Sequence, residues 1–374
     1  MDYRKKLFRW KDPYDIEGTQ GLFIEAMREC CSYHYDHCEA YRRILDDAGF
    51  APESLRKKED IERLPFIPTT FLKKHHIFSM PKERMPIKAT SSGTGGKYSL
   101  IGFDAGSLSS ALKMVFRIYG SQGILSPVPC HYIIFGFKPH RSNHTAVAKT
   151  ATGYTLLSPA LSRTYALKFK DGKYEPDLEA VVNAFMRGEK SRFPVRTIGF
   201  PSYTWFALKL MEERGIKVKL AEGSKIMLAG GWKQFYREQV DKQEMYALVK
   251  KILGIPEENI FEAYGAVEHP ILYSDCKRHH FHIPIYSRVV IRDVETFEPL
   301  PNGRIGLVNL ITPMIKGTPV LSIMTDDLGV LHNEEECGCG IHSPYLEIIG
   351  RAGFVDIKTC AAGAEEILKG EKGT

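Results

Sequence analysis

The chain has 374 residues, of which 43% are hydrophobic, 11% aromatic and 26% charged, and this balance excludes a mainly disordered protein. Lys and Arg number 51 against 45 Asp and Glu, and the small excess is spread thinly, so no nucleic-acid partner is expected. No apolar run approaches the roughly 18 residues of a membrane span and no signal peptide is recognisable, so we expect a soluble cytoplasmic protein.

The first 89 residues are expected to form a helical region. Apolar side chains recur at near-helical spacing over residues 21–48, and Gly49 stands where a helix would end. A short charged helix is expected over residues 52–63, followed by the proline-containing connector 64–68, Leu-Pro-Phe-Ile-Pro.

The next two segments differ in their patterns. Residues 90–283 alternate short apolar runs with amphipathic segments of helix length, which predicts an α/β body whose ligands bind at the carboxyl ends of its strands. Residues 284–350 read as strands and turns and predict a β-rich subdomain. The strands expected in that subdomain cover residues 287–294, 304–311, 320–324 and 345–349. Residues 351–374 are expected to be a short polar tail.

The strongest local signal is a loop rich in glycine and hydroxyl groups at residues 90–99. Its backbone N–H groups could approach phosphate oxygens closely, and Lys97 adds a positive charge. The candidate phosphate-binding residues are Ser91, Ser92, Gly93, Thr94, Gly95 and Gly96. The spacing fits neither a Walker A loop nor G-x-G-x-x-G, and a flexible surface turn has a similar composition.

Three further segments follow this loop in a fixed order. They are Glu-Ala-Tyr-Gly-Ala-Val-Glu at 262–268, Thr-Asp-Asp-Leu-Gly at 325–329, and Gly350-Arg351. Together with the loop they resemble the motifs of the adenylate-forming ligases. Within that superfamily the chain resembles the acyl-protein synthetases of the LuxE type, with a looser likeness to phenylacetate-CoA ligases. The connector 64–68, the segment Phe-His-Ile-Pro at 281–284 and a cysteine near the C-terminus carry this resemblance, which covers about residues 61–360.

The resemblance implies a cofactor and roles for individual residues. ATP is the expected nucleotide, and Glu268 matches the glutamate that holds Mg²⁺. Tyr264 matches an aromatic residue that stacks on adenine, and Asp327 matches the aspartate that binds the ribose hydroxyls. The other implied nucleotide-binding residues are Gly230, Gly231, Gly265 and Arg351. Adenylation places negative charge on the α-phosphate, which a metal ion and hydrogen-bond donors would stabilise.

Four positions depart from the family pattern. Gly95 stands where a threonine is usual, Ser99 replaces a lysine, Val267 replaces a threonine and Asp326 replaces a glycine. These changes remove a hydroxyl and a charge that would contact phosphate. An alternative hypothesis from another functional class therefore stays open, in which the protein is a nucleotide-binding module that has lost catalysis.

Cys360 is the candidate nucleophile. It lies two residues after Lys358 and close to the chain end, where a thiol is accessible and a cation favours its thiolate. In the acyl-protein synthetases a cysteine at the matching place accepts the acyl group. An incidental cysteine in a frayed tail is the plain alternative. The catalytic set expected from the sequence is Cys360, Lys97 and Glu268.

The remaining cysteines indicate a structural zinc site. Cys337 and Cys339 form a tight chelating turn, and Cys276 lies upstream beside three histidines. Three thiolates and one imidazole would complete a closed tetrahedral site. His282 is the preferred fourth ligand because its place after Cys276 fits the phenylacetate-CoA ligase pattern, and His279 and His280 remain alternatives.

The function expected from this resemblance is ATP-dependent activation of a fatty acid as an acyl adenylate, followed by transfer to a protein thiol. The acceptor would be an acyl reductase or another acyl-accepting protein, and a carboxylate-CoA ligase is the alternative. Only 23 residues follow Arg351, so we expect the mobile C-terminal domain of these ligases to be reduced to a short tail. The sequence does not indicate the identity of the acid or the oligomeric state.

Overall fold

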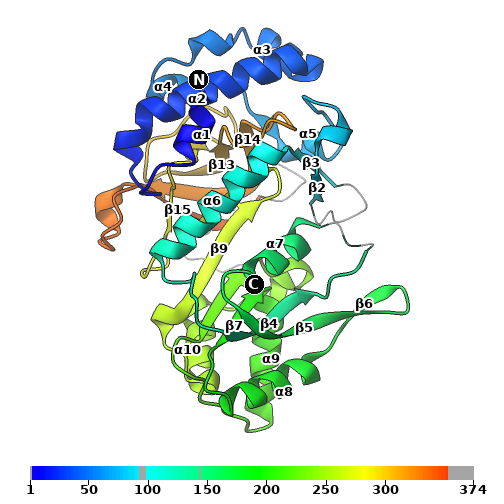
Figure 1. Ribbon diagram of the computed structural model, residues 1–374. Coiled ribbons are helices and arrows are strands. Elements are labelled where there is room, and N and C mark those ends of the chain that lie inside the picture. The colour runs from blue at the N-terminus through cyan, green and yellow to red at the C-terminus, as the bar shows by residue number, and fades with distance from the viewer. Residues whose placement is uncertain (1, 92–97, 142, 144, 353–374) are drawn as a thin grey trace. The chain divides into compact units, whose positions relative to one another are not determined.

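A computed structural model describes residues 2–91, 98–141, 143 and 145–352 of the chain (Figure 1). The chain forms two compact units: unit 1 comprises Met1–Arg117 and Ala266–Thr374, and unit 2 comprises Ile118–Gly265. Each unit therefore has its own packing, and each is described separately. No helix among the described residues is long and apolar enough to cross a membrane.

The N-terminal part of unit 1 is helical. Asp15 caps the long helix α2 by accepting a hydrogen bond from Gly18 N–H, and the buried face of this helix carries Phe23, Met27 and Cys31. The helices of this part are α1 (Tyr3–Leu7), α2 (Ile16–His37), α3 (Glu39–Asp47), η1 (Pro52–Ser54), α4 (Lys58–Glu62), α5 (Thr69–Leu72), η2 (Lys82–Arg84) and α6 (Ala105–Ser121), of which α6 continues into unit 2.

A two-stranded hairpin carries the predicted phosphate loop. Strand β2 (Ile87–Thr90) pairs antiparallel with β3 (Leu100–Phe103). Gly102 N–H donates to Thr318 Oγ1 at 2.9 Å, and a Cβ on Gly317 would lie 2.3 Å from Gly102 O. The hairpin is thus anchored by a close backbone approach that only glycine permits at position 317.

The second half of unit 1 contains the β-rich part that the sequence predicted. Its sheet runs in the order β11-β15-β14-β13-β12, and β1 pairs in parallel with β14. The bounds are β1 (Ile67–Pro68), β11 (Phe281–His282), β12 (Arg288–Arg292), β13 (Ile305–Ile311), β14 (Ser322–His332) and β15 (Tyr345–Arg351), with β10 (His269–Ser274) and η6 (Glu334–Glu336) in the same half. Strand β14 continues well beyond the predicted strand 320–324, through residues 327–329, because it pairs with β13 and β15 across a register shift.

Unit 2 has the α/β architecture expected from its alternating pattern. Its strands lie in the order β9-β8-β7-β4-β5-β6, all parallel except β6. They are β4 (Cys130–Phe137), β5 (Ala160–Lys170), β6 (Lys173–Pro176), β7 (Val195–Gly199), β8 (Lys225–Ala229) and β9 (Ile260–Ala266). The helices are α7 (Ala146–Tyr154), α8 (Leu178–Glu189), α9 (Pro201–Glu213), η4 (Lys233–Glu238), α10 (Lys242–Leu253) and η5 (Glu257–Asn259). Buried residues of the strands and of α8, α9 and α10 form one hydrophobic core.

Candidate nucleotide and metal sites

Glu268 is a buried carboxyl group in unit 1. It lies in the turn that precedes β10, and only 4% of its surface is exposed. Burial raises its pKa above the usual value, while Ser99 and Lys73 act in the opposite direction and the neighbouring Asp326 adds to the rise. The surroundings of Glu268 therefore compensate its ionised form only in part, and a bound cation would supply the missing compensation.

Ser91 and Ser99 join the two ends of the predicted phosphate loop. Ser91 N–H donates to Ser99 O at 3.1 Å, and Ser99 N–H donates to Ser91 Oγ at 2.9 Å. Ser99 Oγ is buried and forms no hydrogen bond of regular geometry with a described residue. It nevertheless lies close enough to the carboxyl group of Glu268 to lower its pKa. The loop residues Ser92, Gly93, Thr94, Gly95, Gly96 and Lys97 lie outside the described residues.

Asp326, the residue that departs from the family glycine, connects three segments of unit 1. Its carboxylate accepts a hydrogen bond from Thr69 Oγ1 at 3.2 Å and lies 3.6 Å from Lys73 Nζ and 3.4 Å from Arg351 Nη2. Sequence reasoning missed Thr69 and Lys73, because a lysine after a four-residue helix has no motif of its own. The structure thus adds a cation to the neighbourhood of Glu268.

Asp327 and Arg351 are partners across neighbouring strands. They face each other in the pairing of β14 with β15, and Arg351 Nε lies 4.0 Å from Asp327 Oδ1. The Arg351 side chain is largely exposed and Asp327 is half-buried. Two predicted ribose-side residues are therefore brought together by the sheet, close in sequence to Asp326.

The other predicted nucleotide-binding residues belong to unit 2. Gly230 and Gly231 follow β8 in left-handed conformations, with φ of +87° and +68°. Tyr264 is half-buried on β9 and Gly265 is exposed beside it. Because Ala229 pairs with Ala263, these residues extend from the carboxyl ends of adjacent parallel strands. That edge is where open α/β sheets bind ligands.

Aromatic side chains gather at the same edge of unit 2. The ring centroids of Phe137 and Phe200 lie 5.8 Å apart, and those of Phe200 and Tyr203 lie 6.1 Å apart. Phe235 packs against Tyr203 at 5.7 Å and Phe206 at 5.0 Å. Because Phe137 ends β4 and Phe200 follows β7, these rings supply an apolar wall at the carboxyl ends of the strands.

The four predicted zinc ligands converge in unit 1. Cys276, His282, Cys337 and Cys339 each offer one ligand atom, and all four atoms lie within 4.8 Å of one another. Cys276 Sγ is 3.6 Å from Cys337 Sγ, and Cys339 Sγ is 3.2 Å from His282 Nε2. Cys276 from the segment between β10 and β11, His282 of β11, and two cysteines from the segment between β14 and β15 are therefore assembled into one donor set.

His282 has the arrangement of a metal-binding imidazole. Its Nδ1 lies 2.7 Å from Ser343 O, so Nδ1–H donates to this carbonyl and the lone pair of Nε2 faces the thiols. Burial lowers its pKa to about 4, which keeps the ring neutral. Of the two alternatives, His279 contacts Asp275 at 2.7 Å, and His280 Nδ1 lies 3.1 Å from Cys337 Sγ while its ring stacks on Tyr345. The geometry of the donor set fits zinc with His282 as its nitrogen ligand.

Cys360 and the rest of the predicted tail lie outside the described residues. The seven other cysteines are free thiols, and six of these seven are buried. None of those six has the accessibility that an acyl-accepting thiol needs.

Comparisons with known proteins agree with the motifs. The family model of the acyl-protein synthetases, LuxE, matches residues 12–369. A phenylacetate-coenzyme A ligase of Thermus thermophilus is 25% identical over 345 residues, which cover 90% of this chain and 71% of that protein. A long-chain-fatty-acid–luciferin-component ligase of Vibrio harveyi is 23% identical over 349 residues, covering 93% of this chain and 88% of that protein.

The fold also has solved counterparts. The structure of a 2-hydroxyisobutyryl-CoA ligase in complex with 2-HIB-AMP and CoA matches with a TM-score of 0.69 at 16% identity, covering 92% of this chain and 70% of that one. At this identity the likeness concerns the fold alone, and it confirms the predicted α/β fold of the adenylate-forming ligases. The chain belongs to the LuxE family of acyl-protein synthetases and is an acyl ligase of the adenylate-forming kind.

Proposed function

We propose that the protein activates a fatty acid with ATP and transfers the acyl group to a protein thiol. The acid's carboxylate oxygen attacks the α-phosphorus, the bond to pyrophosphate breaks, and an acyl adenylate forms. A thiolate then attacks the acyl carbonyl carbon, AMP leaves, and a thioester remains. The observation that carries the first step is the buried, partly compensated Glu268 beside the base of the phosphate loop.

The chain's own groups are assigned as follows. Glu268 holds Mg²⁺, which when bound neutralises charge on the phosphates. Ser91 and the loop residues Ser92 to Lys97 bind the phosphates, and Asp327 and Arg351 bind the ribose side. In unit 2, Tyr264 and Gly265, with Gly230 and Gly231, contact adenine, and the aromatic wall around Phe200 holds the acyl chain.

Cys360 is proposed as the acyl acceptor within the chain, from which the acyl group passes to an acyl reductase. Its support is the sequence: a cysteine two residues after a lysine, within the residues that the family model matches. Release of an acyl-CoA is the second candidate, because a phenylacetate-coenzyme A ligase is about as similar to this chain as the luciferin-component ligase.

One experiment separates these functions. ATP–pyrophosphate exchange is measured against fatty acids of different length and aromatic acids, and mass spectrometry then locates any acyl adduct. We expect exchange with a fatty acid and an adduct on Cys360 that Cys360→Ser abolishes while exchange continues. Rapid acylation of free CoA by Cys360→Ser would favour the CoA ligase. ATP binding without exchange for any acid would favour a nucleotide-binding module that has lost catalysis.

We also propose that Cys276, His282, Cys337 and Cys339 hold one structural zinc ion. Zinc there would join the turn between β14 and β15 to β11 and would take no part in the reaction. Elemental analysis should find about one zinc per chain, and a chelator should lower the melting temperature. Cys339→Ser should lose the metal, whereas Cys38→Ser, a buried cysteine outside the set, should keep it. Absence of zinc from the purified protein would refute the site.

A further inference from the structure

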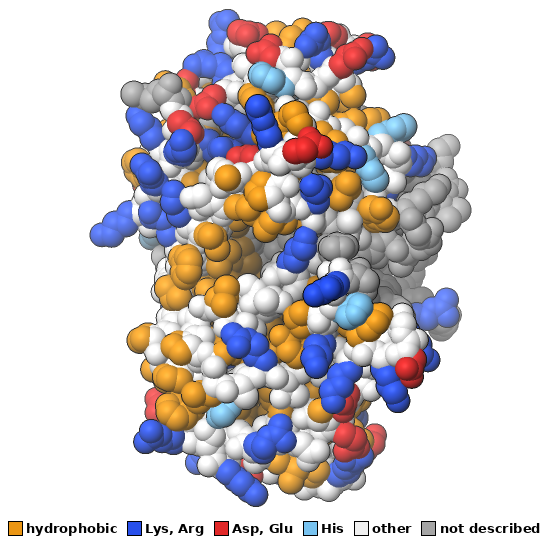
Figure 2. Space-filling view, turned by 45° about the vertical axis from the view of Figure 1, so that its right-hand side comes forward, with side chains coloured by type: hydrophobic (Ala, Val, Ile, Leu, Met, Phe, Trp, Pro, Cys, Tyr) orange, Lys and Arg blue, Asp and Glu red, His pale blue; other side chains and the backbone are white. Residues whose placement is uncertain are grey.

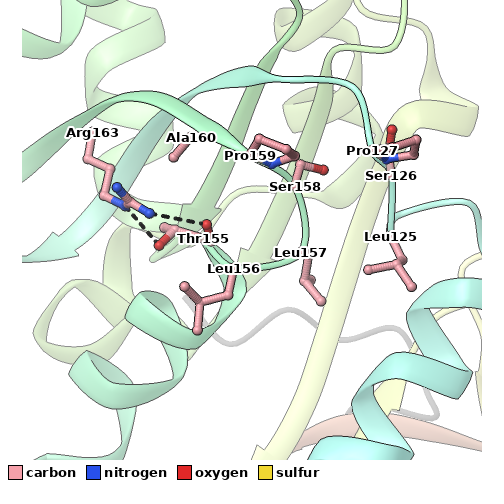
Figure 3. A pocket seen from close by; sticks show the side chains of 10 residues that line it. All are labelled: Leu125, Ser126, Pro127, Thr155, Leu156, Leu157, Ser158, Pro159, Ala160 and Arg163. Atoms are coloured by element: carbon pink, nitrogen blue, oxygen red, sulfur yellow. Dashed lines mark hydrogen bonds between the residues drawn. The ribbon is translucent and has the colours of Figure 1, made fainter.

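A second apolar hollow lies in unit 2, away from the proposed acyl wall. It has a volume of about 610 Å³ and is formed by the loop before β4 and the loop between α7 and β5 (Figure 3). Leu125, Leu156, Leu157 and Pro159 are among its lining residues. Because β4 and β5 are parallel, this is the amino-terminal edge of the sheet. The proposed adenine and acyl residues lie at the opposite edge, so the hollow belongs to neither.

The hollow is unusual in exposing its aliphatic side chains. Leu156 is 69% exposed, and Leu125 is exposed as well. Val128 and Leu161, which are close in sequence to the lining residues, are also exposed, so four of the nine exposed large hydrophobic side chains among the described residues occur in these segments. Single exposed hydrophobic residues are ordinary, but a group of them marks an interaction surface.

Cations adjoin this hollow. Arg163 lines it and also lines a second hollow of about 290 Å³, whose other walls include Lys138, Lys168 and Arg187 and no acidic residue. Lys168 pairs with Asp177, whereas Lys138 and Arg187 have no ion pair with any described residue. Arg163 is held by hydrogen bonds to Thr155, at 3.0 Å from its Nε to Thr155 Oγ1 and 3.4 Å from its Nη2 to Thr155 O (Figure 3).

The net charge of the chain is concentrated in the same unit. Residues 118–265 contain 21 Lys and Arg against 14 Asp and Glu, an excess of seven, while the rest of the chain is close to neutral. In the lower half of Figure 2, Lys and Arg side chains lie among hydrophobic ones. Such a surface attracts anions over a distance comparable to the Debye length.

We propose that this face of unit 2, defined by Leu125, Leu156, Arg163 and Arg187, docks on an anionic lipid bilayer. The leucines enter the boundary between headgroups and acyl chains, and the two arginines pair with lipid phosphates. Of the ten residues that line the first hollow, six are aliphatic residues or prolines, three carry hydroxyl groups and one is Arg163. None of the ten is aromatic or a methionine, and the second hollow adds one aromatic residue, Tyr165. Protein interfaces are instead enriched in aromatic residues and methionine and depleted in lysine, which favours the lipid surface over a protein partner.

Docking goes beyond the proposed function, since it needs neither ATP nor an acyl acceptor. It would bring the enzyme to the phase in which long-chain acids partition. Membrane binding and adenylation can therefore fail independently, and each is measured without the other.

The test is co-sedimentation of the full chain with vesicles. We expect binding to vesicles of equal parts phosphatidylcholine and phosphatidylglycerol, weakening at high salt, and no binding to pure phosphatidylcholine. Leu156→Ser should reduce the affinity about tenfold. Arg187→Gln should reduce it about fivefold.

Matched controls keep the proposal falsifiable. Leu112 is 58% exposed and Lys217 is exposed, and neither lines the two hollows, so Leu112→Ser and Lys217→Gln should bind vesicles like the wild type. All variants should keep the wild-type melting temperature and, without vesicles, the wild-type rate of pyrophosphate exchange. The proposal would be overturned if the protein did not bind anionic vesicles, which is the result expected if the face binds only another protein. It would also be overturned if the control variants lost as much affinity for vesicles as the test variants.

Discussion

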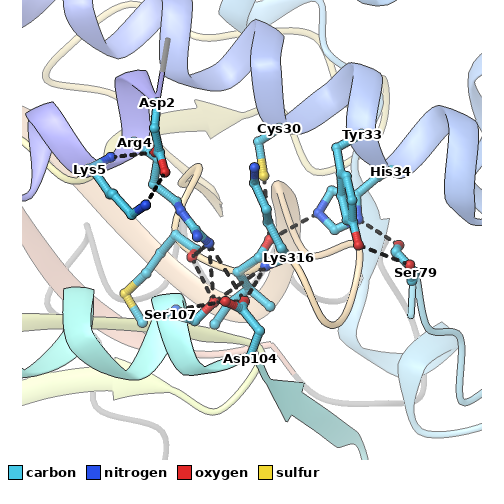
Figure 4. A network of polar contacts seen from close by, with 12 residues as sticks. Asp2, Arg4, Lys5, Cys30, Tyr33, His34, Ser79, Asp104, Ser107 and Lys316 are labelled. Carbon is cyan, nitrogen blue, oxygen red and sulfur yellow. Dashed lines mark hydrogen bonds and ion pairs between the residues drawn. The ribbon is translucent and has the colours of Figure 1, made fainter. Parts of the chain in front are cut away.

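Two clusters of charged groups in unit 1 shift the pKa of their carboxyl groups in opposite directions. In the first, Arg4 is buried, Asp104 is mostly buried, and their charged groups lie 3.6 Å apart (Figure 4). Burial alone would raise the pKa of Asp104, but hydrogen bonds from Ser107 and the charge of Arg4 bring it below its usual value. In the second, the effect of burial exceeds the opposing effects of Ser99 and Lys73, so the pKa of Glu268 stays above its usual value.

The difference lies in how many partners each carboxylate has. Asp104 accepts hydrogen bonds from the hydroxyl and N–H of Ser107 and from Lys316 N–H at 3.3 Å, and Arg4 Nη1 also donates to Met314 O at 3.0 Å. These bonds hold the segment between β13 and β14 against α1 and α6 (Figure 4). Glu268 has weaker compensation. A buried ion pair whose carboxylate accepts several hydrogen bonds is a structural device, whereas a carboxylate left partly uncompensated in a motif is a candidate for binding a cation.

Removing Arg4 should have the largest effect on stability. Arg4→Met leaves Asp104 buried without its cation, and we expect the free energy of unfolding to fall by about 3–5 kcal/mol. Urea unfolding would measure this change. Lys5→Met, which removes an exposed cation from the same helix, is the control and should cost less than about 1 kcal/mol. A similar small loss for Arg4→Met would contradict the structural role of the first cluster.

Glu268→Gln should reduce the activity of the enzyme without reducing its stability, in contrast to Arg4→Met. We expect pyrophosphate exchange to fall about 100-fold or more, because the group proposed to hold the metal ion loses its charge. The melting temperature should not fall, since a neutral amide is less costly to bury than a carboxylate. Glu59→Gln, at an exposed position of α4, should leave both unchanged. Equal losses of activity and stability in Glu268→Gln would mean that this residue belongs to the core.

The sequence predicted the α/β alternation of unit 2 and the β-rich part of unit 1, because both have local periodicity. The order of the motifs also singled out Asp327 and Arg351, which the pairing of β14 with β15 brings together, while the roles predicted for them and for Glu268 stay predictions. The sequence could not predict Lys73 beside Glu268, or Arg4 beside Asp104. Those contacts join residues that are about 100 or more positions apart, and no local pattern encodes such a pairing.

The ion pair between Lys73 and Asp326, near Glu268, can be compared directly with the ion pair between Arg4 and Asp104. Both side chains are mostly buried, and their atoms lie 3.6 Å apart. A double-mutant cycle with Lys73→Met and Asp326→Asn should give a coupling free energy of about 1 kcal/mol, well below that of Arg4 with Asp104. Urea unfolding of the four proteins measures it. A coupling near zero would contradict a stabilising ion pair between Lys73 and Asp326.

The smallest expected effect is a pH dependence that belongs to Glu268 alone. Because its pKa in the folded protein is raised above 4.5, its contribution to stability is most favourable below that pH and is lost as the pH rises through the folded pKa. In metal-free buffer Glu268→Gln should therefore be more stable than the wild type at pH 7, by under about 1 kcal/mol, and equal to it at pH 4. Asp104→Asn should differ in sign, because a lowered pKa makes the ionised form of Asp104 stabilising at pH 7. Unfolding curves of both variants at the two pH values test the comparison directly: the same sign for both would mean that the two clusters are electrostatically alike, and that the partly compensated charge does not distinguish Glu268.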